Sequence, residues 1–229
     1  MDAVRRTHNN IKRQLIKDVA RAGNDILDVG CGFGGDLHKW HACGVKITMC
    51  EPSLDALNEA KRRAKKMNIP VEFHHGDIFV APDKLYDIIC YNFSLQYIFE
   101  SKKFALGSMN EIKKRLKPGG LLIGCIPDSH AIIEKTPFKD RFGNTFELCF
   151  LTNHLNVFLA DTPYYNNGPI SEPIAIEALL EVRLKMRGLV KKMWKPLVDK
   201  PEEDITGLYS KFIFENSGEP STSKEDLNF

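Results

Sequence analysis

Near its N-terminus the chain carries the sequence Ile26-Leu27-Asp28-Val29-Gly30-Cys31-Gly32-Phe33-Gly34-Gly35, in which a short apolar run leads directly into a cluster of glycines. The apolar run predicts a buried strand, and the residues from Asp36 to Trp40 predict the start of a helix. A glycine turn in this position lets the backbone approach a nucleoside closely, and Glu51, at the end of the next predicted strand, can bind a ribose diol. These residues alone leave a dinucleotide and an adenosyl ligand both open.

The alternation of strand and helix continues outward from this turn. An amphipathic helix is predicted over 7–22, helices over 53–67 and 102–116, and strands over 45–50, 71–74, 86–93 and 121–126. Strands that alternate with helices pair in parallel through right-handed crossovers. We therefore expect an α/β fold with a doubly wound, mostly parallel sheet.

The sequence after the fifth predicted strand is less regular. The stretch 138–171 is rich in Asn, Tyr, Phe, Gly and Pro and contains a predicted strand over 145–150, so we expect an insertion over the ligand edge of the sheet. A helix over 172–187 and a strand over 208–214 are predicted to follow, and the polar segment 216–229 is predicted to be a disordered tail. The chain is therefore expected to form a single domain over 1–215.

Composition excludes several classes of protein. Among 229 residues, 43% are hydrophobic and 27% charged, which is typical of a globular domain. The formal net charge of only +2 argues against a protein that coats long nucleic acid. There is no apolar run long enough to span a bilayer and no secretory segment, so we expect no membrane association and an intracellular protein. The six cysteines form no Cys-x-x-Cys pair, and we expect reduced core thiols and no metal site.

Two acidic residues favour the adenosyl ligand. Asp28 stands two residues before Gly30, where a carboxylate repels a pyrophosphate but attracts the ammonium and sulfonium groups of S-adenosylmethionine. Asp77, in Gly76-Asp77-Ile78-Phe79, follows the third predicted strand and offers an acceptor to an adenine amino group. With the turn Leu116-Lys117-Pro118-Gly119-Gly120, the pattern resembles the Rossmann-like class I methyltransferases, which implies S-adenosyl-L-methionine as cofactor.

Longer segments narrow the resemblance to one family. They are Asn9-Asn10-Ile11-Lys12, the extended loop 27–40, Asn92-Phe93-Ser94-Leu95-Gln96-Tyr97-Ile98-Phe99-Glu100-Ser101, Ile126-Pro127-Asp128-Ser129, Phe142-Gly143-Asn144, Ser171-Glu172-Pro173, Leu208-Tyr209 and Phe212-Ile213-Phe214-Glu215. In this order they resemble the mRNA cap guanine-N7 methyltransferases. The short chain is similar to the methyltransferase domains of capping enzymes from large DNA viruses, which leaves open whether it is a module of a longer polypeptide. The resemblance implies a cytoplasmic protein if viral and a nuclear one if cellular.

The resemblance also implies roles for individual residues. The cofactor would be held by Lys12 at the methionine carboxylate, Asp28, Gly30 and Gly32 at the methionine end, Glu51 at the ribose, Asp77 at the adenine and Asn92 beside the methionine. The cap guanine of GpppN would be surrounded by Gln96, Tyr97, Pro127, Glu172 and Tyr209. Purely structural roles are the alternative for Lys12 on its helix surface, Asn92 at a strand end, Tyr97 against the insertion, Glu172 in a first helical turn and Tyr209 in a half-buried strand.

Two departures from the family pattern concern the cap. Gln96 stands where the family commonly has a histidine, which loses an imidazole contact to guanine. Phe33 stands where many members carry a basic residue, so Arg13, Lys39 or the cluster Lys61-Arg62-Arg63 with Lys65-Lys66 would have to supply charge to the triphosphate.

The chemistry that the resemblance implies needs no general base. Guanine N7 carries a free lone pair at neutral pH, so Tyr97, Glu172 and Tyr209 are expected to position the reactants for in-line attack and not to transfer protons. Capped RNA is the expected partner, with further capping-enzyme domains or a stimulatory subunit. The alternatives are a small-metabolite methyltransferase and a noncatalytic module that stimulates a partner.

Overall fold

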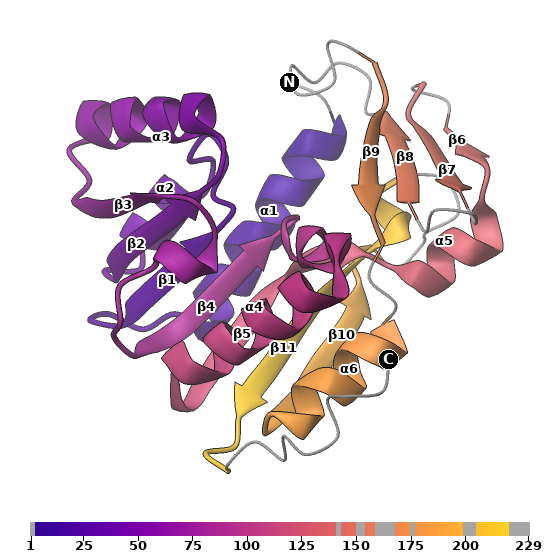
Figure 1. Cartoon of the computed structure of the whole chain (residues 1–229). Helices are drawn as coiled ribbons and strands as arrows, with labels where there is room; N and C mark the ends of the chain where they lie inside the picture. The colour runs from indigo at the N-terminus through magenta and orange to yellow at the C-terminus, as the bar shows by residue number, and fades with distance from the viewer. Residues whose placement is uncertain are drawn as a thin grey trace.

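One twisted sheet organises most of the molecule (Figure 1). The computed structural model describes residues 3–140, 143–149, 154–158, 168–174, 177–198 and 205–219. Within these residues the main sheet has the strand order β10-β11-β5-β4-β1-β2-β3. The strands are β1 (Asp25–Val29), β2 (Lys46–Glu51), β3 (Val71–His75), β4 (Tyr86–Asn92), β5 (Leu116–Pro127), β10 (Leu189–Pro196) and β11 (Tyr209–Asn216). Strands β1 to β5 pair in parallel, while β11 runs antiparallel to β5 and β10, which confirms the expected doubly wound sheet.

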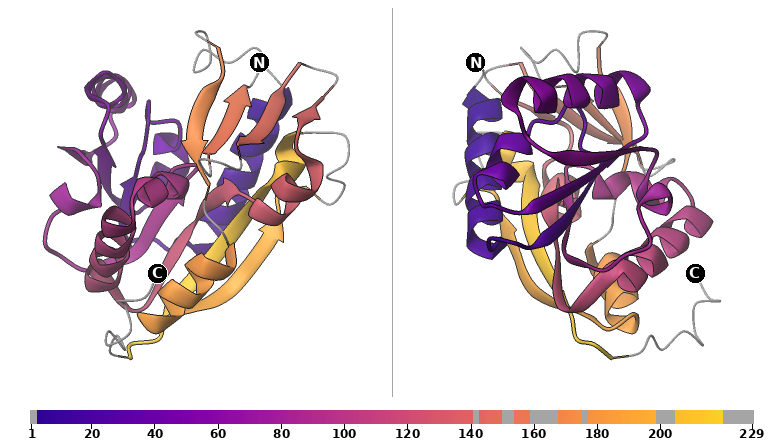
Figure 2. Two further views of the ribbon diagram at one scale, coloured as in Figure 1. Left: turned by 45° about the vertical axis from the view of Figure 1, so that its right-hand side comes forward. Right: turned by 90° about the vertical axis from the view of Figure 1, so that its left-hand side faces the viewer.

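Helices cover both faces of this sheet. They are α1 (Ala3–Val19), α2 (Leu37–His41), α3 (Leu54–Met67), α4 (Lys102–Arg115), α5 (Ser129–Lys135) and α6 (Glu177–Met186), with short 3-10 turns η1 (Ile78–Val80), η2 (Leu95–Glu100) and η4 (Ile205–Leu208). Ser53 caps α3 as expected, because its side chain accepts the Ala56 N–H. In Figures 1 and 2, α4 and α6 lie on one side of the sheet and α1 on the other.

Each face of the sheet has its own apolar cluster. Leu15 and Ile16 of α1 and Trp40 of α2 pack in one cluster, and Ile112 of α4 and Leu184 of α6 pack in the other. All five side chains are at most 2% exposed, so the 3.6-residue periodicity of the sequence matches real burial on both faces. The part of the chain that the structure describes contains no helix that is both long and apolar enough to cross a membrane.

A smaller antiparallel sheet follows β5. It consists of β6 (Phe138–Lys139), β7 (Thr145–Cys149), β8 (His154–Phe158) and β9 (Ile170–Pro173) in this order. Phe146, Leu155 and Val157 of this sheet are buried in the same cluster as Tyr209 of β11. Apolar packing thus connects the small sheet to the main sheet, and Figure 2 shows the two sheets next to each other.

Two elements differ from the sequence-based expectation. The helix predicted over 172–187 was wrong at its start: Glu172 lies in β9, opposite Leu155 of β8, and α6 begins only at Glu177. Strand β10 was not predicted, because Lys191, Lys192 and Lys195 interrupt its apolar pattern. Lysines of this kind are common on exposed edge strands, where they discourage association.

The C-terminal boundary also differs in detail. Asn216, placed in the predicted tail, is the last residue of β11, where it accepts a hydrogen bond from Lys113 Nζ (2.6 Å) and donates one to Leu116 O (2.7 Å). Residues 220–229 of the predicted tail lie outside the described residues, as does Phe150 of the predicted strand over 145–150.

Candidate active site

A large cleft opens at the carboxyl ends of the parallel strands. Its volume is about 1800 Å³, above the 300–1000 Å³ common for a single small-molecule site, so there is room for two ligands side by side. The strand order changes direction between β1 and β4, and ligands of doubly wound sheets bind at such a switch point. Every predicted site residue except Pro127 lines this cleft, namely Lys12, Asp28, Gly30, Gly32, Glu51, Asp77, Asn92, Gln96, Tyr97, Glu172 and Tyr209.

Pro127 lies just behind the cleft wall. It is the buried last residue of β5 and pairs with Tyr209 of β11. The structure therefore brings Pro127 to the correct end of the sheet, where it supports a lining residue.

Asp28 is a buried carboxylate at the floor of the cleft. Its Oδ2 accepts a hydrogen bond from the indole N–H of Trp40 at 3.0 Å, and the residue is 2% exposed. Burial, reinforced by the charge of nearby Asp36, raises the pKa of Asp28 to about 7. A carboxylate in this state gains most from a cationic ligand, since a positive charge stabilises its ionised form.

Asp36 connects three polar side chains of the same wall. It accepts bonds from Lys12 Nζ (2.9 Å), Lys39 Nζ (2.5 Å) and Asn92 Nδ2 (2.9 Å). Burial alone would raise the pKa of Asp36, but the two ammonium groups hold it below its usual range. The network fixes Lys12 and Asn92 in the cleft and leaves Asn92 Oδ1 buried without a hydrogen-bond partner among the described residues.

The glycine turn adopts a left-handed backbone at three positions, Gly30, Gly32 and Gly34. Gly30 and Gly32 have φ of +72° and +54°, in the left-handed region. A Cβ on Gly30 would also lie 2.5 Å from Cβ of Ser94, whose hydroxyl donates to Val29 O. The turn is held to the next strand by Glu51, whose Oε2 accepts the Gly32 N–H at 2.8 Å while Oε1 accepts the Ser53 N–H at 2.8 Å.

Glu172 forms a second, separate polar centre of the cleft. Its Oε1 accepts the hydroxyl proton of Tyr97 (2.8 Å) and its Oε2 accepts a bond from Gln96 Nε2 (3.1 Å). The side chain is 5% exposed, and burial raises its pKa despite these two hydrogen bonds. Gln96 Nε2 also donates to Phe93 O, and because both of its partners are acceptors, Gln96 Oε1 is left buried without a partner among the described residues.

Aromatic rings stand between the two polar centres. Tyr209 is 4% exposed and contacts Phe93 edge-on, with centroids 5.4 Å apart, while His8 stacks on Phe93 at 4.9 Å. Lys12 Nζ lies 5.9 Å from the centroid of the Phe93 ring. Tyr209 is therefore more buried than the half-buried strand tyrosine that the structural alternative expected. Part of its side chain still lines the cleft.

Cationic side chains reach the rim of the cleft from α1 and α3. Several basic residues were expected to supply the charge that is missing at Phe33. Those that line the cleft are Arg13, Arg62, Arg63 and Lys66. Glu59 holds Arg62 and Arg63 in place through bonds of 2.6 Å and 2.7 Å. Lys39 was a wrong candidate for this role, because it is 2% exposed and bonded to Asp36.

Residues outside the predicted set also shape the cleft. Asp36, Phe93, Ser94 and His8 line it, yet only their contacts distinguish them from ordinary loop and helix residues. Of these four residues, Asp36 is the one that the local sequence could have indicated. It precedes Lys39 by three residues, a spacing at which opposite charges can form an ion pair on one face of a helix.

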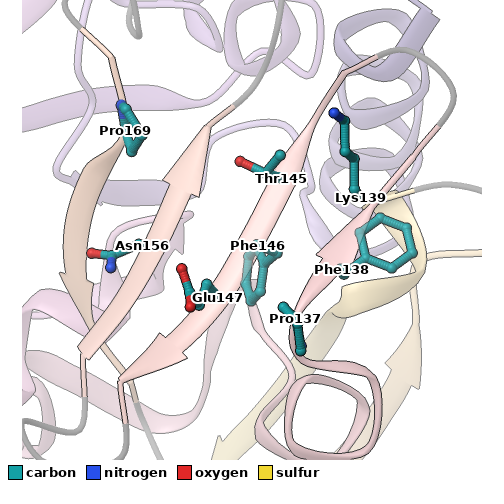
Figure 3. A pocket seen from close by; sticks show the side chains of 8 residues that line it. All are labelled: Pro137, Phe138, Lys139, Thr145, Phe146, Glu147, Asn156 and Pro169. Atoms are coloured by element: carbon teal, nitrogen blue, oxygen red, sulfur yellow. The ribbon is translucent and has the colours of Figure 1, made fainter.

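A second pocket does not involve the predicted residues. It measures about 580 Å³ and lies on the small sheet, lined by Pro137, Phe138, Lys139, Thr145, Phe146, Glu147, Asn156 and Pro169 (Figure 3). Within the described ranges, no group of three or more His, Cys, Asp or Glu side chains is arranged to hold a metal ion.

Sequence comparison gives a family match over most of the chain. The model of the mRNA (guanine-N(7))-methyltransferase domain matches residues 2–165. The mRNA cap guanine-N(7) methyltransferase of Schizosaccharomyces pombe is 34% identical over 163 residues, which cover 62% of this chain and 44% of that protein. The chain spans less than half the length of the curated relatives that it matches.

Solved structures share the fold at low identity. The PH0226 protein from Pyrococcus horikoshii superposes with a TM-score of 0.72 at 15% identity, covering 94% of this chain and 92% of that one. An S-adenosylmethionine-dependent methyltransferase from Clostridium acetobutylicum gives a TM-score of 0.66 at 16% identity, with 92% and 91% coverage. These similarities confirm the Rossmann-like class I methyltransferase fold.

Proposed function

Because the chain belongs to the mRNA (guanine-N(7))-methyltransferase domain family, we propose that it transfers a methyl group from S-adenosylmethionine to N7 of the guanine in a GpppN RNA cap. The observation that carries this proposal is the pairing of two distinct polar centres in one cleft. Asp28 forms the first and Glu172 the second, and both are buried carboxylates with raised pKa values. The Asp28 centre suits a cationic methyl donor, and the Glu172 centre suits a nucleobase that donates hydrogen bonds.

The first centre fits S-adenosylmethionine. Asp28 supplies negative charge for the ammonium and sulfonium groups, and the unpartnered Oδ1 of Asn92 is a further acceptor for the ammonium. Lys12, held by Asp36, supplies positive charge for the carboxylate. Glu51 keeps lone pairs for the ribose diol after accepting two backbone N–H groups. When bound, the cofactor supplies an electrophilic methyl group on its sulfonium.

The second centre fits the edge of guanine. Guanine presents an N1–H and an exocyclic NH₂ on one edge, and the two oxygens of Glu172 can accept from both. Tyr97 and Gln96 donate to those same oxygens, which fixes the carboxylate plane and favours its ionised form. Gln96 Oε1 is an additional acceptor, so Gln96 offers guanine an amide contact where the family commonly has an imidazole.

The residues of the cleft would act by orienting the reactants. Guanine N7 carries no proton, so its attack on a methyl group releases none from the ring and requires no base. The contribution of the protein is then proximity, alignment and a fixed electrostatic environment. We assign Tyr97, Glu172 and Tyr209 to positioning, with Pro127 supporting Tyr209 from the neighbouring strand.

The phosphates of the cap would be met by the cationic rim. Arg13, Arg62, Arg63 and Lys66 line the cleft from two helices, and the guanidinium groups of Arg62 and Arg63 are oriented by Glu59. Arginine forks suit phosphate oxygens because they can bond in pairs. This arrangement supplies the charge that Phe33 does not.

A transfer assay with tritium-labelled S-adenosylmethionine and GpppA tests the proposal. Transfer to GpppA by this chain alone is the expected result. A small-metabolite methyltransferase would bind the donor but neither bind nor methylate GpppA. A noncatalytic stimulatory module would show no transfer alone yet increase the activity of a separate capping methyltransferase.

A further inference from the structure

The lining of the cleft includes two buried hydroxyl groups that the proposed function does not use. Tyr91 of β4 and Ser108 of α4 both line the cleft and are 2% and 0% exposed. Tyr91 Oη and Ser108 Oγ have no hydrogen-bond partner among the described residues. Buried hydroxyls without a partner are rare in folded proteins and call for an explanation, because each costs free energy.

Packing around Ile78 and Phe79 places both residues beside Asp77. Tyr91 packs in the same buried cluster as Ile78, the residue that follows Asp77. Ser108 lies one turn after Phe104 on α4, the centroid of the Phe104 ring lies 5.7 Å from that of the Phe79 ring, and Phe79 N in turn donates to Asp77 Oδ1. Ile78, Ile98 and Phe104 complete the lining. This part of the cleft is therefore lined by apolar side chains together with one carboxylate and two hydroxyl groups.

This chemistry fits a flat heteroaromatic ring with polar atoms on its edge. Apolar side chains cover the faces of such a ring, while hydroxyls can both donate to ring nitrogens and accept from an amino group. A carboxylate alone can only accept, so it cannot satisfy a ring nitrogen. Tyr91 and Ser108 would supply the donors that Asp77 lacks.

We propose that Tyr91 and Ser108 form part of the adenine subsite and hydrogen-bond the edge of the adenine ring of the methyl donor. The inference rests on the proposed function, since it assumes an adenosyl ligand in this cleft. It assigns the two hydroxyls to ligand recognition and explains why the fold retains them without protein partners.

Calorimetry with S-adenosylhomocysteine and 5′-methylthioadenosine tests the proposal. Tyr91→Phe and Ser108→Ala should each weaken both ligands by about threefold to tenfold, the usual effect of one lost hydrogen bond. Equal losses are expected because 5′-methylthioadenosine retains the adenine but lacks the amino-acid end. Tyr86→Phe is the matched control: it removes a hydroxyl from the same strand outside the cleft, and affinity should not change.

Thermal melting of the ligand-free variants separates binding from folding. Removing a hydroxyl that lacks a partner should leave the melting temperature of Tyr91→Phe equal to or above that of the wild type. A folded Tyr91→Phe and a folded Ser108→Ala that both bind the two ligands like the wild type would overturn the adenine assignment. If the wild type itself binds neither ligand, the adenosyl site fails as a whole and with it the proposed function.

Discussion

The hydroxyl of Tyr97 donates to Oε1 of Glu172 at 2.8 Å, which joins the 3-10 turn after β4 to a strand of the small sheet 75 residues later. Gln96 donates to the other oxygen of the same carboxylate. Glu172 is therefore fixed in orientation before any ligand arrives, as a group must be to select a substrate by shape and hydrogen bonding.

Replacing Glu172 by Gln should impair the cap and spare the donor. The amide would present an NH₂ group to the donors of guanine, and a lost charge-assisted bond in a buried site costs roughly 2–4 kcal/mol, so kcat/KM for GpppA should fall by about 30- to 1000-fold. Steady-state kinetics measure this loss, and calorimetry with S-adenosylmethionine should show unchanged affinity. Equal loss of both ligands would mean that Glu172 maintains the structure of the whole cleft.

Asp28 should make donor binding depend on pH. Its pKa of about 7 means that the ligand-free carboxyl is largely protonated at pH 6 and ionised at pH 8. A cationic donor binds the ionised form, so affinity should increase about tenfold from pH 6 to pH 8. In Asp28→Asn, where Trp40 keeps an acceptor, donor binding should be weaker and this dependence absent. An identical pH profile in Asp28→Asn would show that Asp28 does not face the cationic end of the donor.

The raised pKa of Asp28 should also make the stability of the ligand-free protein decrease as the pH rises. The pKa of Asp28 is raised in the folded state relative to about 3.9 when unfolded, so its contribution to stability is complete below pH 4 and is lost as the pH rises through 7. Urea unfolding of the wild type and Asp28→Asn at pH 5 and pH 8 measures the difference. The wild type should lose more stability over this interval than the variant, and equal losses would contradict the assignment.

Two substitutions in the Asp36 network should have different effects, one mainly on stability and the other mainly on donor binding. Asp36→Asn leaves the ammonium of Lys39, whose side chain is fully buried, without its counter-charge, and breaking such a pair costs roughly 3–5 kcal/mol. Lys12→Met leaves the Asp36–Lys39 pair intact and should keep most of the stability while losing donor affinity. Urea unfolding and calorimetry on the two variants measure both quantities. Similar stability losses in both would contradict this division.

The residues that we assign to the donor could be predicted to share one cleft because their signals are local. The glycine turn, Asp28 and Glu51 lie within one strand-turn-helix-strand unit, and left-handed backbone at Gly30 and Gly32 follows from their residue type. The partner of Asn92 could not be predicted, since Asp36 reaches it from 56 residues away, and the indole of Trp40 has no sequence signal that directs it to Asp28.

The polar centre around Glu172 depends on contacts between distant segments. Glu172 precedes Pro173 and a helix-forming sequence, which locally favours a helix start, yet pairing with β8 places it in a strand. Its partners Tyr97 and Gln96 lie on η2, and only the tertiary structure brings them within hydrogen-bond distance. Resemblance to a family supplied what periodicity and spacing could not.

The rate of methyl transfer should not depend on a histidine. His8 and His38 line the cleft, but attack by N7 needs no base, so the single-turnover rate with both ligands saturating should be flat through the histidine range around pH 6.5. Rapid-quench measurements between pH 6 and pH 8 test this. A step that disappears in His8→Asn or His38→Gln would show that a histidine takes part in the reaction.

The most direct test of the account is methyl transfer to GpppA compared with its 7-deazaguanine analogue, which has carbon in place of N7 but keeps the N1–H and NH₂ edge. The account predicts that GpppA becomes 7-methyl-GpppA, identified by mass spectrometry after digestion, while the 7-deaza analogue inhibits competitively and is not methylated. Methylation of the 7-deaza analogue, or methyl groups at another atom of GpppA, would contradict the assignment of N7 as the nucleophile.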